Sequence, residues 1–151
     1  MTKKIFIGAA LLLFTLPALS QEEDTVTSYL QALFVIEDYD RIIAYGEDAD
    51  REALSSVALY YLGLAHFTRE NDSLAIVFLD ESITKHPNFQ EPYYYIGLVH
   101  LFNHRLEESE TYLTAALRIK ADSRTHMALA ELYEKGGYPE KVMEHLEQAM
   151  E

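Results

Sequence analysis

The chain of 151 residues contains no cysteine and has few basic residues. Without cysteine, a disulfide framework, a zinc–thiolate site and a catalytic thiol are all excluded. Only 12 Lys and Arg residues stand against 25 Asp and Glu residues, which gives a net charge of −13. A chain of this charge repels phosphate backbones and anionic lipid surfaces, so nucleic acid is not expected among its partners.

The sequence also lacks any stretch in which apolar and polar residues alternate with a period of two. Such alternation marks half-buried β-strands, so no sheet is expected. Apolar residues instead recur at helical spacing from Asp24 onward. Breaks between these segments predict helices over 25–36, 39–48, 52–68, 73–85, 90–102, 106–119, 123–135 and 139–150.

The first 20 residues have the layout of a secretory signal. Lys3 and Lys4 form a basic start, Ile5 to Leu16 form an apolar run of twelve residues, and small residues precede a cleavage point at Ser20/Gln21. An apolar run of that length is too short to span a bilayer comfortably, so no stable membrane anchor is expected. We therefore predict residues 1–20 as a cleaved signal peptide and a periplasmic or secreted location for residues 21–151.

Two heptapeptides reveal an internal repeat. Residues 60–66 read Tyr-Tyr-Leu-Gly-Leu-Ala-His, and residues 94–100, 34 positions later, read Tyr-Tyr-Ile-Gly-Leu-Val-His. A fixed period of this length is typical of repeat arrays, in which each unit buries its apolar face only by stacking on its neighbours.

These residues resemble the tetratricopeptide repeat family, whose unit is a helix–turn–helix of 34 residues. The resemblance covers essentially all of 23–151: a degenerate unit at about 23–55 and repeats at 56–89, 90–122 and 123–151. The repeat at 56–89 carries the family motif as Leu59, Leu62-Gly63, Ala75, Leu79, Ser82 and Pro87. The resemblance implies an all-α, right-handed solenoid of about three to four repeats, in which Gly63 and Gly97 permit close helix packing.

In this family, a partner binds along the concave face, which is lined by the first helix of each repeat. The resemblance places eight apolar or aromatic residues there: Tyr60, Tyr61, Leu64, Phe67, Tyr94, Tyr95, Leu98 and Leu101. We expect this stripe to bind a protein segment with apolar and aromatic side chains, since tyrosine offers rigid area and a hydroxyl at small entropic cost. The alternative is that several of these residues pack against adjacent units. If they form the binding site, Tyr60→Ala with Tyr94→Ala will abolish partner capture and leave thermal stability largely intact.

Two histidines stand where the family usually has tyrosine, namely His66 and His100. They can be interpreted as a paired metal or pH-sensing site, or as two buried rings that each make one hydrogen bond. Spacing places no third ligand beside them, which favours the second interpretation. No nucleophile elbow, phosphate loop or metalloprotease motif is present, so no enzymatic activity, metal or cofactor is expected.

The sequence stops after the second helix of its last repeat, where Met143 and Met150 would face a following unit. Such a face can bind a partner or a second copy of the chain, or can remain a small tolerated patch. We thus expect an exported, non-catalytic scaffold that binds protein or peptide. The alternative is a structural subunit of an envelope complex that assembles through this end.

Overall fold

The computed structural model describes residues 25–150. The predicted signal peptide, residues 1–20, lies outside the described residues, as does its cleavage point. Between residues 25 and 150, eight helices follow one another and no strand occurs, which confirms the all-α prediction. None of these helices is both long and apolar enough to cross a bilayer. The helices cover 25–35, Tyr39–Asp48 (α2), Ser56–Thr68 (α3), Asp72–Lys85 (α4), Gln90–Phe102 (α5), Leu106–Ile119 (α6), Ser123–Gly136 (α7) and Pro139–Met150 (α8).

The predicted helix ends agree with the structure to within one residue, except at the start of α3. The prediction began this helix at residue 52, whereas it begins at Ser56. Ser55 is in an extended conformation, and its Oγ accepts a hydrogen bond of 3.0 Å from the Ala58 amide. A serine in this role satisfies one of the free amides of the first turn, so it fixes where the helix starts.

Asp122 caps α7, because its carboxylate accepts a hydrogen bond of 2.8 Å from the Thr125 amide. Asn71 precedes α4 but makes no capping hydrogen bond with its side chain. At the end of α7, Gly137 takes the left-handed conformation with φ of 76°, which glycine adopts without steric cost.

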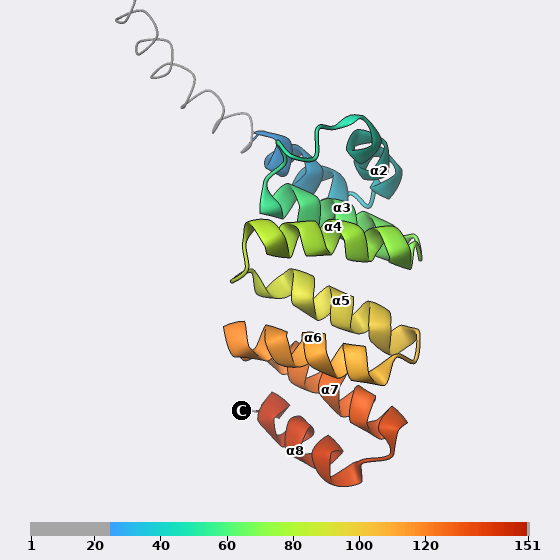
Figure 1. Ribbon diagram of the computed structural model, residues 1–151, viewed down its shortest axis with the longest axis vertical. Helices are drawn as coiled ribbons and strands as arrows, with labels where there is room; N and C mark the ends of the chain where they lie inside the picture. Colours follow the sequence, from blue (N-terminus) through green and yellow to red (C-terminus); the bar gives the residue numbers. More distant parts are fainter. Residues whose placement is uncertain (1–24, 151) are drawn as a thin grey trace, which may run out of the picture.

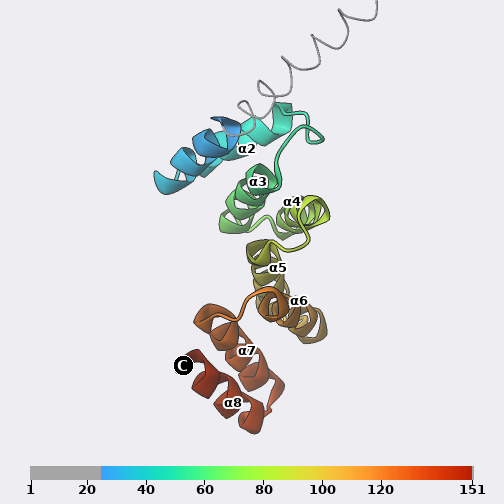
Figure 2. The same ribbon diagram turned by 90° about the vertical axis from the view of Figure 1, so that its left-hand side faces the viewer.

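The helices are arranged as antiparallel pairs that stack into a column from α2 at one end to α8 at the other (Figure 1). The most extensive contacts lie within pairs, between α3 and α4, α5 and α6, and α7 and α8. Successive pairs meet through α4 with α5 and α6 with α7, and the first helices also touch, α3 with α5 and α5 with α7. In the turned view the pairs follow one another along the column, each beside only its neighbours (Figure 2). The predicted helix–turn–helix solenoid is therefore the observed fold, and its stability comes from units contacting adjacent units.

Close approach of the two helices within a pair depends on glycine, as predicted. A Cβ placed on Gly63 would lie 2.6 Å from Leu79 Cγ of α4, and one on Gly97 would lie 2.7 Å from Leu113 Cγ of α6. Beside Gly97, the buried Ser109 hydroxyl donates a hydrogen bond of 2.9 Å to the Gly97 carbonyl. The buried Ser109 hydroxyl thus has a hydrogen-bond partner inside the pair.

Candidate functional site

The predicted aromatic stripe forms a chain of ring contacts that runs through successive repeats. We call this set of rings the aromatic chain. Adjacent rings have centroids 5.4 to 6.2 Å apart, the range in which tilted and edge-to-face pairs attract. In order from the N-terminal end, its members are Tyr39, Phe34, Tyr61, Tyr60, Tyr95, Phe67 and Phe102.

Tyr60 lies at the centre of the aromatic chain and joins two repeats. Its ring contacts Tyr61 at 5.4 Å, Phe89 at 5.1 Å and Tyr95 at 5.9 Å. Burial raises the pKa of the Tyr60 hydroxyl, and the neighbouring Tyr95 and Glu91 raise it further. These contacts give Tyr60 a packing role between α3 and α5, so the alternative interpretation of the stripe applies to this residue.

Two leucines of the predicted stripe belong to the core, and their assignment to an open groove is wrong. Leu64 is 3% exposed and Leu101 is 0% exposed, so no partner can reach either side chain. Leu101 packs in a cluster with Leu113 of α6 and Leu129 of α7. Leu64 belongs to α3, which contacts α2, α4 and α5.

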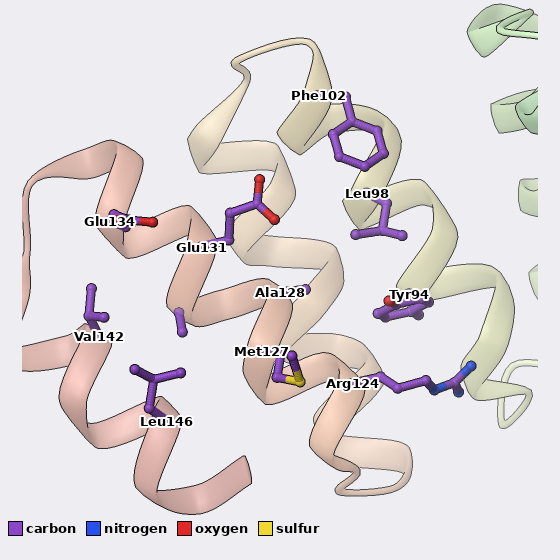
Figure 3. Close-up of a pocket in the computed structure, with 11 residues that line it drawn as sticks. Tyr94, Leu98, Phe102, Arg124, Met127, Ala128, Glu131, Glu134, Val142 and Leu146 are labelled. Atoms are coloured by element: carbon purple, nitrogen blue, oxygen red, sulfur yellow. The ribbon is translucent and has the colours of Figure 1, made fainter.

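An open groove of about 580 Å³ lies in the C-terminal half of the chain, between α5, α7 and α8 (Figure 3). Of the predicted stripe, Tyr94 and Leu98 line it, and Phe102 continues their row one turn further along α5. The α7 side is formed by Arg124, Met127, Ala128, Ala130, Glu131 and Glu134, and the α8 side by Val142 and Leu146. The remaining predicted residues, Tyr61, Phe67 and Tyr95, are half-buried members of the aromatic chain.

Several apolar side chains in this groove are open to solvent. Phe102 is 56% exposed, Met127 is 60% exposed and Leu146 is 40% exposed. In the close-up, Leu98 and Phe102 of α5 face Met127 and Leu146 across the space between the helices (Figure 3). An exposed apolar surface bounded by charged groups is typical of a site for a protein segment.

Charged groups mark the two ends of the α7 wall. At its N-terminal end, the Arg124 guanidinium lies 5.0 Å from the centre of the Tyr94 ring and 3.2 Å from an Asp122 carboxylate oxygen. Burial opposes ionisation of Asp122, but hydrogen bonds from Thr125, Gln90 and Arg124 lower its pKa to about 2. At the C-terminal end, Glu131 pairs with Lys135 at 3.3 Å, whereas no ion pair to Glu134 occurs within residues 25–150.

Some groove residues were missed by sequence reasoning. Phe102 lies four residues beyond Leu98 and eight beyond Tyr94, so a strict spacing of four along α5 would have selected it in place of Leu101. Val142 and Leu146 share that spacing on α8. They were overlooked because the family pattern assigns the groove to the first helix of each pair, and α8 is a second helix.

The two repeat histidines are buried rings that stack on aromatic residues. His66 stacks on Phe78 of α4 at 5.3 Å, and His100 stacks on Tyr112 of α6 at 5.5 Å. The expected hydrogen bond is not made by Nδ1 of either ring, since neither Nδ1 has a partner among the described residues. Burial lowers the pKa of both imidazoles. Between residues 25 and 150, no three His, Cys, Asp or Glu side chains come together in a group that could hold a metal ion.

A second histidine pair, absent from the sequence predictions, joins α7 to α8. The Nδ1 atoms of His126 and His145 lie 3.0 Å apart, and the His145 ring stacks on Tyr133 at 5.3 Å. The Tyr133 hydroxyl donates to Glu110, which also pairs with Lys141 at 3.6 Å. Because α8 has no buried residue of its own, these contacts help to hold α8 against α7 and so keep its side of the groove in place.

The comparisons with known proteins establish the fold and nothing finer. No protein-family model matches the chain, and no curated protein matches it. Among solved structures, a crystal structure of MamA matches with a TM-score of 0.69 at 20% identity, over 90% of this chain and 81% of the MamA chain. A second crystal structure of MamA gives 0.69 at 20% identity, over 89% of this chain and 75% of that one.

Proposed function

We propose that this protein is a non-catalytic interaction scaffold and that a partner protein segment binds in the groove between α5, α7 and α8. The observation that carries the proposal is the exposure of Phe102, Met127 and Leu146 on three helices that face one space. Burial of apolar area stabilises a complex by roughly 25 cal/mol per Å² before the costs of association, so side chains that fill this space provide the driving force.

Site-specific photo-crosslinking tests the proposal. A photoreactive phenylalanine analogue replaces Met127 in the groove or, as a control, Val77 on α4, which is 40% exposed and does not line the groove. After irradiation in an extract of the source cells, position 127 is expected to yield a discrete protein adduct that position 77 does not. Equal labelling from both positions, or none from position 127, would remove the groove as the binding site.

A second candidate function is a structural subunit that assembles through α8. Its outer face carries Met143, 58% exposed, and Met150, 81% exposed. A hollow of about 320 Å³ at the start of α8 is lined by Met143 together with Tyr138 and Val142. Self-association through this face would appear in sedimentation velocity as a concentration-dependent dimer that Met143→Glu with Met150→Glu abolishes. A strict monomer at high concentration would eliminate self-association.

We also propose that the chain is exported after removal of residues 1–20. The basic start, the apolar run of twelve residues and the small residues before Gln21 support this proposal. Cleavage would remove two lysines and no acidic residue, so the mature protein would be more acidic still. The mass of the protein purified from its natural source tests the cleavage point, and an intact Met1 would contradict it.

A further inference from the structure

The groove has unequal charges at its two ends. Near the start of α7, the charge of Arg124 is compensated by the Asp122 carboxylate 3.2 Å away. Near the end of α7, two carboxylates line the groove, those of Glu131 and Glu134. Within residues 25–150, Glu131 pairs with Lys135 and both side chains are exposed, so water screens that pair strongly, whereas Glu134 has no ion-pair partner there.

The C-terminal end of the groove therefore carries a carboxylate, that of Glu134, that has no ion-pair partner among residues 25–150 and lies beside an apolar surface. In the close-up, the carboxylate of Glu131 lies between α7 and α5, and Glu134 lies one turn further toward the α8 side (Figure 3). The remainder of the chain adds to this potential, since its net charge is −13. A cation brought to this end gains attraction from both sources, whereas an additional carboxylate is repelled by both.

We propose that the groove selects a segment with apolar side chains and a lysine or arginine at one end, and that the basic residue binds at the Glu131 and Glu134 end. This inference rests on the proposed function, because it specifies the partner of the same groove. The apolar side chains of the segment occupy the space between Leu98, Phe102 and Leu146. Since α7 rises about 15 Å from Arg124 to Glu134, a segment of roughly ten helical residues spans the groove.

The charges determine at which end of the groove the basic residue of the segment lies. The Arg124 end is neutralised by Asp122 and stacked on Tyr94, so it contributes little selection for charge. The selective end is the one with Glu134, which lines the groove and is exposed. A segment with its basic residue at the wrong end would have to bind in the reverse direction or lose the attraction.

Two fluorescent model peptides test the proposal. Both are about ten residues long and carry the same leucine and phenylalanine positions. One ends in two lysines, and the other ends in two glutamates. Binding to the full-length mature protein is measured by fluorescence anisotropy at low salt and again at high salt. The lysine peptide is expected to bind about three- to tenfold more tightly, with the difference reduced at high salt because exposed charges are screened.

Charge reversal locates the effect. Glu134→Lys changes the groove, and Glu140→Lys changes the net charge equally at an exposed position of α8 that does not line the groove. Glu134→Lys is expected to remove or invert the preference for the lysine peptide, while Glu140→Lys leaves most of it. If both variants weaken the preference equally, the selection is a property of net charge and the proposal is overturned.

The proposal and the function on which it rests fail in different ways. If both peptides bind wild type equally and Met127→Glu abolishes binding of both, the groove binds segments but does not select basic ones. If neither peptide binds the wild-type protein, or if Met127→Glu changes nothing, the groove is not a segment-binding site and both proposals are overturned.

Discussion

The ring of Tyr60 in α3 packs against the ring of Tyr95 in α5, with their centroids 5.9 Å apart. The two residues belong to consecutive repeats, so this contact is part of what holds one repeat on the next. Tyr94, the residue equivalent to Tyr60 one repeat later, lines the groove instead and lies under the Arg124 guanidinium. The same repeat position thus joins two repeats in one unit and, partly buried, lines the groove in the next.

Tyr60→Ala is therefore expected to destabilise the protein, contrary to the expectation from sequence that stability would be largely intact. Loss of contacts with Phe89 and Tyr95 leaves a space between repeats, and truncation of a buried aromatic residue costs about 3–5 kcal/mol. Because Tyr60 is only partly buried, we expect about 2–3 kcal/mol in urea unfolding. Tyr94→Ala is the matched control and should cost distinctly less. Equal losses for the two variants would contradict the separate roles.

Gly97→Ala is expected to lower the free energy of unfolding by about 1 kcal/mol. The new methyl would meet Leu113 at less than 3 Å, and overpacking costs about 1–3 kcal/mol, while alanine returns up to about 1 kcal/mol in helix propensity. In a Leu113→Ala background the clash is absent, so the same substitution should be neutral or stabilising. A cost that is independent of residue 113 would show that the close approach is not the cause.

Asp122→Ala is expected to cost about 1–3 kcal/mol, since it removes the α7 cap and one acceptor of the buried Gln90 amide. Asp122→Asn retains the capping oxygen and should recover much of that loss.

The native pKa of the Asp122 carboxyl, about 2, lies below the ordinary value of 3.8, so the native state binds fewer protons than the unfolded state. The contribution of the carboxylate is thus present above about pH 4 and is lost as the pH falls toward 2. Wild type should therefore be more stable than Asp122→Asn above about pH 4, and acid titrations followed by circular dichroism should show this difference shrinking as the pH falls toward 2.

Acidification toward pH 5 is also expected to destabilise the protein through histidine. Burial lowers the pKa of His66, His100 and His145 in the native state, and the unfolded value is about 6.5. The unfolded state then binds more protons below about pH 7, so the free energy of unfolding falls as the pH drops from 7 to 5. Thermal unfolding of wild type at pH 7.5 and pH 5.5 measures this fall.

Replacement of the two stacked histidines tests whether they cause this acid sensitivity. His66→Phe with His100→Phe retains ring packing and removes two buried nitrogens that have no hydrogen-bond partner in the described part of the chain. The double variant should be less sensitive to acid than wild type. His145 should retain part of the pH dependence, because burial and the neighbouring His126 lower its pKa. An unchanged slope in the double variant would show that His66 and His100 are not the origin of the pH dependence.

The fold could be predicted from the sequence because the repeat is visible in local sequence features. The two heptapeptides 34 residues apart, the helix breaks and the glycines that face Leu79 and Leu113 each predict the packing that is observed. The exposure of individual side chains could not be predicted as well. Phe67 and Leu101 occupy equivalent positions, yet Phe67 is a half-buried ring against Tyr95 and Leu101 lies in the core.

Contacts between side chains of neighbouring helices could not be predicted from the sequence pattern either. Nothing in the spacing of His126 and His145 indicates that their rings meet, since the distance between them depends on how α8 packs on α7. The groove contributions of Val142 and Leu146 depend on that packing as well. A periodic stripe identifies which residues share a helix face, but the neighbouring units decide which of them remain open to solvent.

The central claim, that a partner segment occupies the space between α5, α7 and α8, is tested most directly by the effect of Met127→Glu on binding. Met127 is 60% exposed, so the substitution places a charge in the apolar groove without disturbing the core. Val77→Glu on α4 is the control for added charge at an exposed apolar position. We predict that Met127→Glu abolishes capture of the partner cross-linked from position 127, with an unchanged melting temperature, while Val77→Glu binds as wild type does. Undiminished capture by a folded Met127→Glu protein would contradict the claim.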